Sequence, residues 1–299
     1  MEYRNLTAQD GHIIQTFVWA KPDAKAWIHI LHGMAEHAER YNEIACALVE
    51  AGYAVVAHNH RGHGNNLSED ELGIFSAKDG WNKVLQDVDF VRQSITDDKP
   101  YFLLGHSMGS FVAQSYMSTQ PERVAGLILS GTNFQPASLL KSGNVIAKIE
   151  RFRLTPLKVS RLLQYLSFEA FNNAFKPIRT EFDWLTRDES IVDITIDDPR
   201  CGFDCKIQLW LDLFSGLINL YAEEGYKKIQ DDLPIYIFGG DKDPVGANGK
   251  GLYLLSKAYK EAGQTQVSLK IYEGGRHEML NETNRDEVYK DLISWIDSH

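Results

Sequence analysis

The chain has 299 residues, which is enough for one large α/β domain with an insertion or for two smaller domains. Its formal net charge of −10 argues against nucleic acid as a partner, because binding to phosphates needs clustered Lys and Arg. With only three cysteines, no N-terminal apolar signal stretch and no run near the ~18 apolar residues of a membrane span, we expect a reducing, cytoplasmic location.

Strand-like and helix-like segments alternate along the first part of the chain. Two extended stretches, 3–8 and 12–19, flank Asp10-Gly11, a dipeptide typical of a hairpin turn. The segments that follow are strands over 26–31, 53–57, 101–104 and 124–129, and helices over 41–51, 81–95 and 110–117. Buried, β-branched strands that alternate with helices favour a parallel sheet with helices on both faces.

The alternation stops between about residues 133 and 232, where no regular strand–helix pattern is visible. It resumes with the strands 234–238 and 267–272 and the helices 251–261 and 286–297. We therefore predict an α/β fold with a mostly parallel, eight-stranded sheet and an inserted helical cap. In this prediction residues 1–132 and 233–299 form the core, and residues 133–232 form the cap.

The pentapeptide Gly105-His106-Ser107-Met108-Gly109 lies between a predicted strand and a predicted helix. The pattern G-x-S-x-G in that setting is typical of a sharp turn that exposes the serine hydroxyl. Glycine is expected on both sides, because a side chain there would clash where strand and helix pass closely. Ser107 is therefore the predicted nucleophile.

A serine hydroxyl needs a base to activate it and an acid to orient that base. His277, in the loop after strand 267–272, is the predicted base. Asp243, in the loop after strand 234–238, is the preferred acid, although spacing alone leaves Asp241 open. Catalytic triads on mostly parallel sheets of this kind occur along the chain in the same order: serine, then acid, then histidine.

Acyl transfer also needs hydrogen-bond donors for the oxyanion. We expect the backbone N–H of Met108 and the backbone N–H of Met34, in the loop after strand 26–31, to supply them. No metal or organic cofactor is needed for this chemistry. Cys201-x-x-x-Cys205 has no second Cys or His pair at zinc-like spacing, so free thiols are expected there.

With these residues, the chain resembles the α/β-hydrolase superfamily, and within it the monoacylglycerol lipase and lysophospholipase (serine aminopeptidase-like) group. The segment H-G-M-A-E-H-A-E-R-Y, residues 32–41, is similar to the group's H-G-x-x-E-H-x-x-R-Y.

A second motif, H-R-G-H-G at residues 60–64, matches the group's D-H-R-G-H-G except at its first position. Asn59 replaces the usual Asp there, and we expect this change to cost a structural hydrogen bond. Segments 184–188 and 198–203 resemble cap segments of bacterial members. The resemblance spans nearly the whole chain and is weaker in the cap.

The resemblance implies an α/β-hydrolase fold and the triad Ser107, Asp243 and His277. The expected activity is hydrolysis of the ester of a monoacyl lipid, a monoacylglycerol or a lysophospholipid, through an acyl-enzyme on Ser107. One alternative is an aminopeptidase or amidase on the same scaffold, which would need an acidic pocket for a free amine. Another is a catalytically silent, hydrolase-like binding protein. The substrate is a small acyl ester, and the choice between monomer and homodimer stays open.

The resemblance also places Gly33, Glu36 and Arg40 near the substrate. Glu36 and Arg40 have two interpretations: they shape the pocket for the alcohol, or they form a buried ion pair that braces the oxyanion loop. In monoacylglycerol lipases a histidine three places after the catalytic one contacts glycerol. Leu280 stands at that place here, which weakens the case for glycerol.

Residues 141–161 of the predicted cap are basic and apolar in an otherwise acidic chain. Apolar side chains alternate with Lys148, Arg151, Arg153 and Lys158. One interpretation is transient contact of the cap with an anionic membrane surface, or attraction of a lysophospholipid phosphate. The other is an ordinary cap helix with its apolar face on the core.

Overall fold

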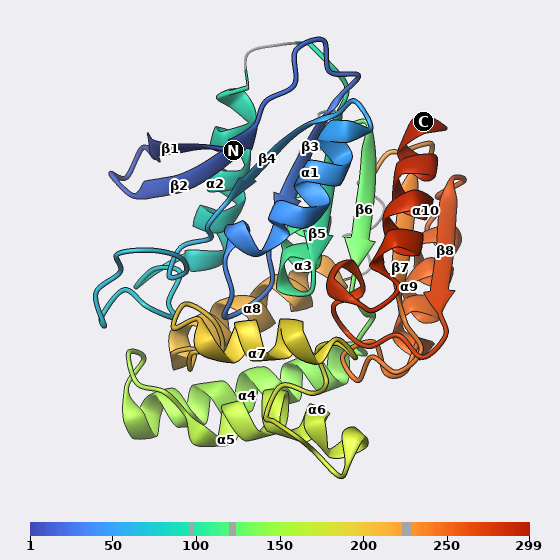
Figure 1. The fold of residues 1–299 in the computed structure, drawn as a ribbon. Helices are drawn as coiled ribbons and strands as arrows, with labels where there is room; N and C mark the ends of the chain where they lie inside the picture. The colour runs from blue at the N-terminus through green and yellow to red at the C-terminus, as the bar shows by residue number, and fades with distance from the viewer. Residues whose placement is uncertain (96–97, 120–123, 223–228) are drawn as a thin grey trace.

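A computed structural model describes residues 1–95, 98–119, 124–222 and 229–299 (Figure 1). Within these residues one sheet has eight strands, in the order β1-β2-β4-β3-β5-β6-β7-β8. The strands are β1 (Glu2–Thr7), β2 (Ile13–Trp19), β3 (Trp27–Leu31), β4 (Ala54–His58), β5 (Tyr101–His106), β6 (Gly126–Ser130), β7 (Ile235–Gly240) and β8 (Val267–Tyr272). β2 pairs antiparallel with β1 and β4, and the other neighbours are parallel. The predicted mostly parallel sheet is confirmed.

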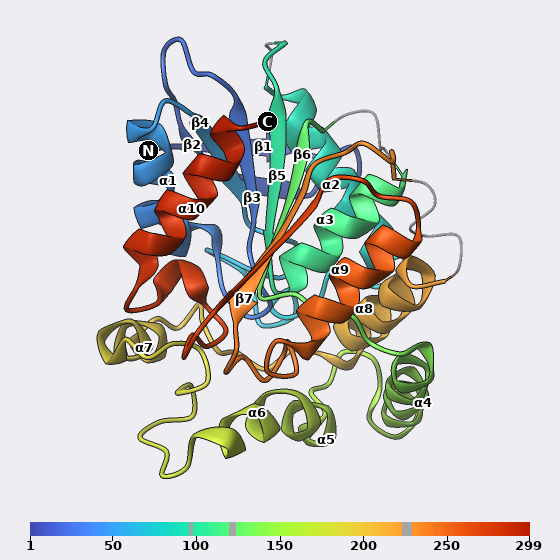
Figure 2. The ribbon, with the colours of Figure 1, turned by 90° about the vertical axis from the view of Figure 1, so that its right-hand side faces the viewer.

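Helices cover both faces of the sheet (Figure 2). α1 (Asn42–Glu50) and α10 (Arg285–Asp297) lie on one face, and α2 (Gly80–Gln93), α3 (Met108–Thr119) and α9 (Lys250–Glu261) lie on the other. Side chains along each strand alternate between the two faces. In β5, Phe102 and Leu104 therefore belong to the apolar cluster with α1 and α10, while Leu103 belongs to the cluster with α2, α3 and α9.

Between β6 and β7 the described residues form helices and loops, apart from one isolated bridge between Val159 and Lys206. These elements are α4 (Ala137–Leu154), α5 (Arg161–Gln164), the π-turn η3 (Tyr165–Glu169), α6 (Ala170–Asn172), η4 (Asn173–Phe175), α7 (Glu189–Asp197) and α8 (Ile207–Leu220). α4 to α7 lie past the carboxyl ends of the parallel strands (Figure 1). The expected helical character of this stretch is confirmed for its described part.

α8 connects the helical stretch to the rest of the molecule. It packs against α4 and also against α2 and α3. Leu213 and Leu217 of α8 join the same apolar cluster as Leu103 of the central strand β5. The division into a core and a cap at residues 133 and 232 remains a prediction, because this cluster continues across it. None of the described helices has the length and apolar character needed to cross a bilayer.

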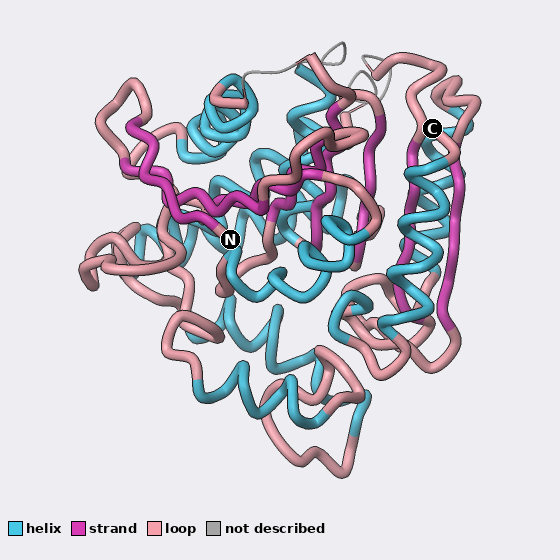
Figure 3. Tube along the Cα trace, turned by 45° about the horizontal axis from the view of Figure 1, so that its top comes forward, coloured by secondary structure: helices cyan, strands magenta, loops and turns pink. Residues whose placement is uncertain are grey.

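The parallel strands bring six loops to the side of the sheet where their carboxyl ends lie. The loops follow β3, β4, β5, β6, β7 and β8, and ligands bind at such carboxyl ends in open α/β sheets. Short 3-10 turns lie in two of these connections, η1 (Ala38–Tyr41) after β3 and η6 (Met279–Asn281) after β8. β1 and β2 form a hairpin at one lateral side of the sheet, and β7 and β8 form the opposite lateral side (Figure 3).

Candidate active site

Ser107 lies on a sharp turn between β5 and α3. Its φ angle is +51°, a left-handed conformation that non-glycine residues rarely adopt. Its backbone N–H donates to the carbonyl of Ser130, 2.9 Å away in the next strand, and this bond fixes the turn against the sheet. A Cβ atom on Gly105 would collide with the backbone of Gly109, and one on Gly109 would collide with the carbonyl of Leu31. The two glycines therefore allow the close strand–helix crossing expected from the sequence.

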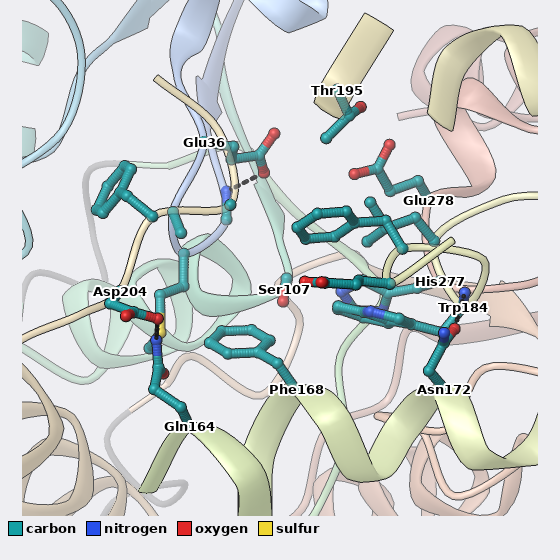
Figure 4. A pocket seen from close by; sticks show the side chains of 18 of the residues that line it. Glu36, Ser107, Gln164, Phe168, Asn172, Trp184, Thr195, Asp204, His277 and Glu278 are labelled. Atoms are coloured by element: carbon teal, nitrogen blue, oxygen red, sulfur yellow. Dashed lines mark hydrogen bonds between the residues drawn. The ribbon is translucent and has the colours of Figure 1, made fainter. Parts of the chain in front are cut away.

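His277 and Asp243 form a buried pair beside this turn. The imidazole Nδ1 lies 3.1 Å from each carboxylate oxygen of Asp243, and the side chains are 2% and 0% exposed. A carboxylate only accepts hydrogen bonds, so Nδ1 carries the proton and Nε2 keeps a free lone pair. Ser107 lies next to the imidazole (Figure 4). No hydrogen bond joins Ser107 Oγ to His277 Nε2 in this structure, as is common before substrate binds.

The environment of His277 favours its charged form. Burial alone would lower the pKa of the imidazole, but the negative charge and hydrogen bond of Asp243 outweigh burial and raise the pKa above its ordinary value. The same interaction stabilises the imidazolium that forms when the histidine takes up a proton.

The structure brings Asp243, and not Asp241, to the histidine. Asp241 Oδ1 accepts the backbone N–H of Gly274 at 2.7 Å, and its other oxygen lies 3.3 Å from Lys242 Nζ. Asp241 therefore supports the turn that leads to His277 without contacting the imidazole. Spacing in the sequence left these two acids open, and loop geometry separates them.

The loop after β3 passes directly beside the nucleophile. A Cβ atom on Gly33 would lie 3.2 Å from Ser107 Cβ. The N–H of Gly33 donates to Glu36 Oε1 at 2.5 Å, so it is not available to a substrate. The N–H groups of Met34 and Met108 donate to no protein acceptor within the described residues. These two amides, predicted as the oxyanion donors, are thus left free, and Met108 is at the N-terminus of α3.

Glu36 and Arg40 form the buried network that the ion-pair interpretation expects. Arg40 Nη1 donates to Glu36 Oε2 at 2.6 Å, and Glu36 Oε1 accepts the hydroxyl of Tyr41 at 2.9 Å. Arg40 also contacts both carboxylate oxygens of Glu278 at 2.8 Å. Glu36 and Arg40 also line the cavity above Ser107 that is described below, so the pocket interpretation stays open beside the ion pair.

Sequence reasoning did not single out Glu278. Its position directly after His277 was the available signal. Burial alone would raise the pKa of Glu278, but the Arg40 guanidinium outweighs burial and holds the pKa well below its ordinary value, so the carboxylate stays charged. Arg40 therefore links the oxyanion loop to the loop that carries the base.

Asn59 makes hydrogen bonds at the position where the group usually has Asp. Its Oδ1 accepts the backbone N–H of Ala38 at 2.8 Å, and its Nδ2 donates to Gln15 Oε1 at 2.8 Å. Both ends of the amide are paired, so the expected loss of a hydrogen bond is not seen. Nearby, His63 Nε2 accepts the N–H of Ala35 at 3.1 Å, which gives the loop after β3 a second support from the H-R-G-H-G segment.

A cavity of about 510 Å³ opens above Ser107. This volume is in the range of small-molecule sites. Most of its apolar wall comes from residues 165–203, namely Phe168, Ile178, Phe182, Trp184, Leu185 and Phe203. Figure 4 shows Phe168 and Trp184 close to Ser107 and His277. Sequence reasoning did not assign these side chains to the cavity, because residues in turns and in a single helical turn give no periodic signal.

One cluster with metal-ligand chemistry lies near this cavity. Ligand atoms of His37, Asp198 and Cys201 all lie within 4.8 Å of one another. Asp198 is already paired with Arg200 at 2.7 Å and with His37 at 3.0 Å, and burial raises the pKa of the Cys201 thiol to about 12. The cluster is thus an ion-paired contact with a protonated thiol. Cys201 and Cys205 form no disulfide.

Comparison with known proteins places this geometry in a family. Residues 22–284 match the family model described as serine aminopeptidase, S33. Monoglyceride lipase from Mus musculus is 30% identical over 301 residues, which cover 98% of this chain and 89% of that protein. Monoacylglycerol lipase from Mycolicibacterium smegmatis is 27% identical over 94% of this chain and 92% of that protein.

Solved structures agree with this placement. A thermostable carboxyl esterase from Bacillus coagulans, in complex with glycerol, superposes with a TM-score of 0.91 at 27% identity. The match covers 99% of this chain and 98% of that one. The chain therefore belongs to the serine aminopeptidase S33 family of α/β-hydrolases, in the group of the monoacylglycerol lipases, and is a serine hydrolase.

Proposed function

We propose that this protein hydrolyses the carboxylic ester of a monoacyl lipid through an acyl-enzyme on Ser107. The observation that carries the proposal is the contact of His277 Nδ1 with both oxygens of Asp243, beside a serine on a strained turn. The apolar and aromatic wall of the cavity suits a fatty acyl chain. The relatives' names, monoglyceride lipase and monoacylglycerol lipase, point to the same substrate class.

Acylation begins when Ser107 Oγ attacks the ester carbonyl carbon and its proton moves to His277 Nε2. The carbonyl oxygen becomes an oxyanion, which the free N–H groups of Met34 and Met108 stabilise. Asp243 stabilises the imidazolium. The C–O bond to the alcohol then breaks, and the leaving alkoxide takes the proton from Nε2.

Deacylation repeats these steps with water. His277 Nε2 removes a proton from a water molecule as the water oxygen attacks the acyl carbon. The bond to Ser107 Oγ breaks, the serine recovers its proton from the imidazolium, and the fatty acid leaves. The chain's own groups supply every proton transfer in this scheme.

We further propose that residues 133–232 act as a cap that selects the substrate. Phe168, Phe182 and Trp184 of this stretch line the cavity. Trp184 packs against the imidazole of His277, with ring centroids 5.0 Å apart, so this stretch meets the loops of the core directly. The acyl chain would lie against these aromatic side chains, and the alcohol would meet the polar lining.

A transient contact of this cap with a membrane surface is part of the proposal. On α4, Val145, Ile149 and Phe152 share one helical face and are 54%, 59% and 96% exposed. The buried side of the same helix packs Leu140 and Ala147 on the core. α4 is therefore apolar on its outer side too, between basic side chains that would favour an anionic surface.

Vesicle flotation tests the membrane contact. We expect wild-type protein to float with anionic vesicles and Phe152→Asp to lose most of that binding. Tyr253→Asp is the matched control, because Tyr253 lies on α9 and is 62% exposed. Equal flotation of wild type and F152D, or no preference for anionic over neutral vesicles, contradicts the contact.

An aminopeptidase remains a second candidate because of two acids in the cavity wall. Glu181 and Asp204 both line the cavity. Within the described residues, neither has an ion pair. A free ammonium group on the substrate would find partners there. The finding that family members are described as serine aminopeptidases adds to this candidate.

One substrate panel tests the proposal. It contains p-nitrophenyl esters from C2 to C16, a 1-monoacylglycerol, lysophosphatidylcholine and an aminoacyl-naphthylamide. We expect ester turnover that Ser107→Ala abolishes in folded protein, together with loss of labelling by a fluorophosphonate. Turnover confined to the aminoacyl amide identifies the aminopeptidase, and absence of both turnover and labelling identifies a silent binding protein.

A further inference from the structure

The oxyanion loop, which follows β3, contains three successive N–H groups with different partners. The N–H of Gly33 donates to Glu36 Oε1 at 2.5 Å (Figure 4). The N–H of Ala35 donates to His63 Nε2 at 3.1 Å. The N–H of Met34, between them, donates to no protein acceptor within the described residues. The loop thus keeps one amide free and ties down the two beside it.

His32 sets the direction of the free amide. The carbonyl of Gly33 and the N–H of Met34 belong to one trans peptide group, so they point in opposite directions. His32 Nδ1 lies 2.7 Å from that carbonyl oxygen, and the side chain is fully buried. Because a carbonyl oxygen only accepts, Nδ1 carries the proton and donates it. The N–H of Met34 therefore points away from the buried imidazole, while Gly33 and Met34 both line the cavity.

His63 holds the next peptide group along the loop. The carbonyl of Met34 and the N–H of Ala35 share that group, and its N–H is the one bound to His63 Nε2. Ala35 has a φ angle of +54°, a left-handed conformation that persists only where the surroundings enforce it. The two peptide groups that meet at the Cα atom of Met34 are therefore each held by an imidazole.

The contacts of each imidazole allow a single tautomer. His32 Nε2 accepts the backbone N–H of His60 at 2.9 Å, so its proton is on Nδ1. His63 Nδ1 lies 2.9 Å from the carbonyl oxygen of Arg61 and donates to it, which leaves Nε2 as the acceptor. Burial lowers the pKa of both imidazoles and keeps them neutral near pH 7. All four ring nitrogens are thus bound, and neither ring can turn without losing a hydrogen bond.

We propose that His32 and His63 are positioning residues that lock the amide of Met34 in its oxyanion-binding orientation. Neither imidazole lines the cavity, so both act through the backbone of the loop. The hydrogen bond from His32 also polarises the peptide group of Met34, which makes its N–H a stronger donor. This stabilisation grows when the substrate carbonyl becomes an oxyanion, so it favours the transition state over the bound ester. The inference rests on the proposed ester hydrolysis, with Met34 as an oxyanion donor.

Reciprocal amide substitutions test the lock. The side-chain amide of Asn reaches about as far as Nδ1 of histidine, and that of Gln reaches about as far as Nε2. His32→Asn therefore keeps a donor for the Gly33 carbonyl, whereas His32→Gln loses it. At His63 the order is reversed, because His63→Gln keeps an acceptor for the N–H of Ala35 and His63→Asn does not. We expect H32Q and H63N to lose about 10- to 100-fold in kcat/KM for p-nitrophenyl laurate, less than the 10²–10³ typical of a deleted oxyanion donor. H32N and H63Q should stay close to wild type.

Two ketones separate the direction of the amide from a loss of folded protein. A long-chain trifluoromethyl ketone is attacked by Ser107 Oγ at its carbonyl carbon, the proton moves to His277 Nε2, and the ketone oxygen becomes an oxyanion. The methyl ketone of the same length binds without this addition. We expect Ki of the trifluoromethyl ketone to rise in H32Q and H63N in proportion to the loss of kcat/KM, while Ki of the methyl ketone stays constant. Misfolding would reduce the amount of active protein and change neither Ki.

His60→Phe is the matched control. The ring of His60 packs 4.3 Å from that of His32 but has no hydrogen-bond partner among the described residues, and its backbone N–H remains in the variant. If H32Q and H63N match H60F in kcat/KM and in Ki of the trifluoromethyl ketone, the lock is wrong and ester hydrolysis stands. A loss that is equal in H32N and H32Q also overturns the lock. If wild type neither hydrolyses p-nitrophenyl laurate nor binds the trifluoromethyl ketone, the proposed function fails, and the lock fails with it.

Discussion

Arg40 donates two parallel hydrogen bonds of 2.8 Å to the two carboxylate oxygens of Glu278, the residue directly after the proposed base. Arg40 comes from η1, at the end of the loop that carries the predicted oxyanion donor, whereas Glu278 comes from the loop after β8. The pair thus fixes two parts of the site, more than 230 residues apart in sequence, against each other. A bidentate contact of this kind restrains orientation as well as distance.

Replacing Arg40 should damage the fold and the site together. Arg40→Met leaves the carboxylates of Glu36 and Glu278 buried without a cation, which typically costs about 3–5 kcal/mol. Arg40→Lys keeps the charge but not the planar fork, so we expect an intermediate loss. Thermal melts and kcat/KM measure both. Arg179→Met, in an exposed ion pair with Asp193, is the control and should leave Tm and kcat/KM close to the wild-type values, because exposed ion pairs contribute little.

We expect replacement of Asp243 and replacement of Asp241, the two acids after β7, to have very different effects on activity. Asp243→Asn replaces one carboxylate oxygen by an NH2 donor, and because the remaining oxygen accepts the N–H of Val245, the NH2 faces His277 Nδ1 and favours the wrong tautomer. We therefore expect kcat to fall by about 10⁴ with the fold retained. Asp241→Asn keeps an oxygen for the N–H of Gly274 and should stay close to wild type. Steady-state kinetics of the two purified variants decide the question. A loss in D241N as large as that in D243N would contradict the assignment.

The activity should have an acid limb set by His277. Only the neutral imidazole accepts the proton of Ser107, and Asp243 raises the pKa of His277 above its ordinary value of 6.5. As the pH falls through this raised pKa, kcat/KM should fall about tenfold per pH unit. A pH–rate profile with p-nitrophenyl butyrate measures the limb. An acid limb with a pKa below 6.5 would mean that another group controls activity.

The sheet and the strand-to-helix turn were predictable because they leave local patterns. Apolar runs of strand length, and a serine between two glycines after one of them, depend only on neighbours in sequence. The preference for Asp243 over Asp241 came from the resemblance and only weakly from spacing, since both acids lie in one loop and the path of that loop separates them. Glu278 was also missed, because its partner Arg40 is distant in sequence and no periodicity connects them.

The cavity wall was the least predictable part. α5 and α6 contain only four and three residues, too few to show a helical repeat. The position of Phe168 follows from how these short helices pack over the strand ends. The helical content of this region was predictable from the absence of strand patterns, whereas the side chains that line the cavity depend on how its short segments pack in three dimensions.

Five buried histidines form a cluster beside the site, at β3, β4 and the loops that follow them. They are His29, His32, His58, His60 and His63, each at most 2% exposed. Burial lowers the pKa of every one of them, to about 3 for His29 and about 4 for His63. All five are therefore neutral in the folded protein near pH 7, and all five titrate near 6.5 once the chain unfolds.

This cluster predicts acid lability. A histidine whose pKa is lowered in the folded state stabilises that state above the unfolded pKa, and the stability is lost as the pH falls below about 6.5. A histidine that stays neutral in the folded state down to pH 5.5 removes up to about 1.4 kcal/mol of stability between pH 7.5 and 5.5, a large amount for a domain of ordinary stability. His277 acts in the opposite direction, because its pKa is raised. Thermal melts should show a steep fall in Tm over this range.

His60 offers the sharpest test of the cluster, because both of its ring nitrogens are buried without a partner among the described residues. Its ring packs 4.3 Å from that of His32. His60→Phe keeps a ring of similar shape and removes both the unpaired polar atoms and one titrating site. We expect its Tm to equal or exceed the wild-type value at pH 7.5 and to exceed it by a wider margin at pH 5.5. The exposed His299→Gln serves as control, with the same Tm difference from wild type at both values. If H60F loses stability between pH 7.5 and 5.5 as steeply as wild type, His60 is not one of the groups that take up protons on unfolding.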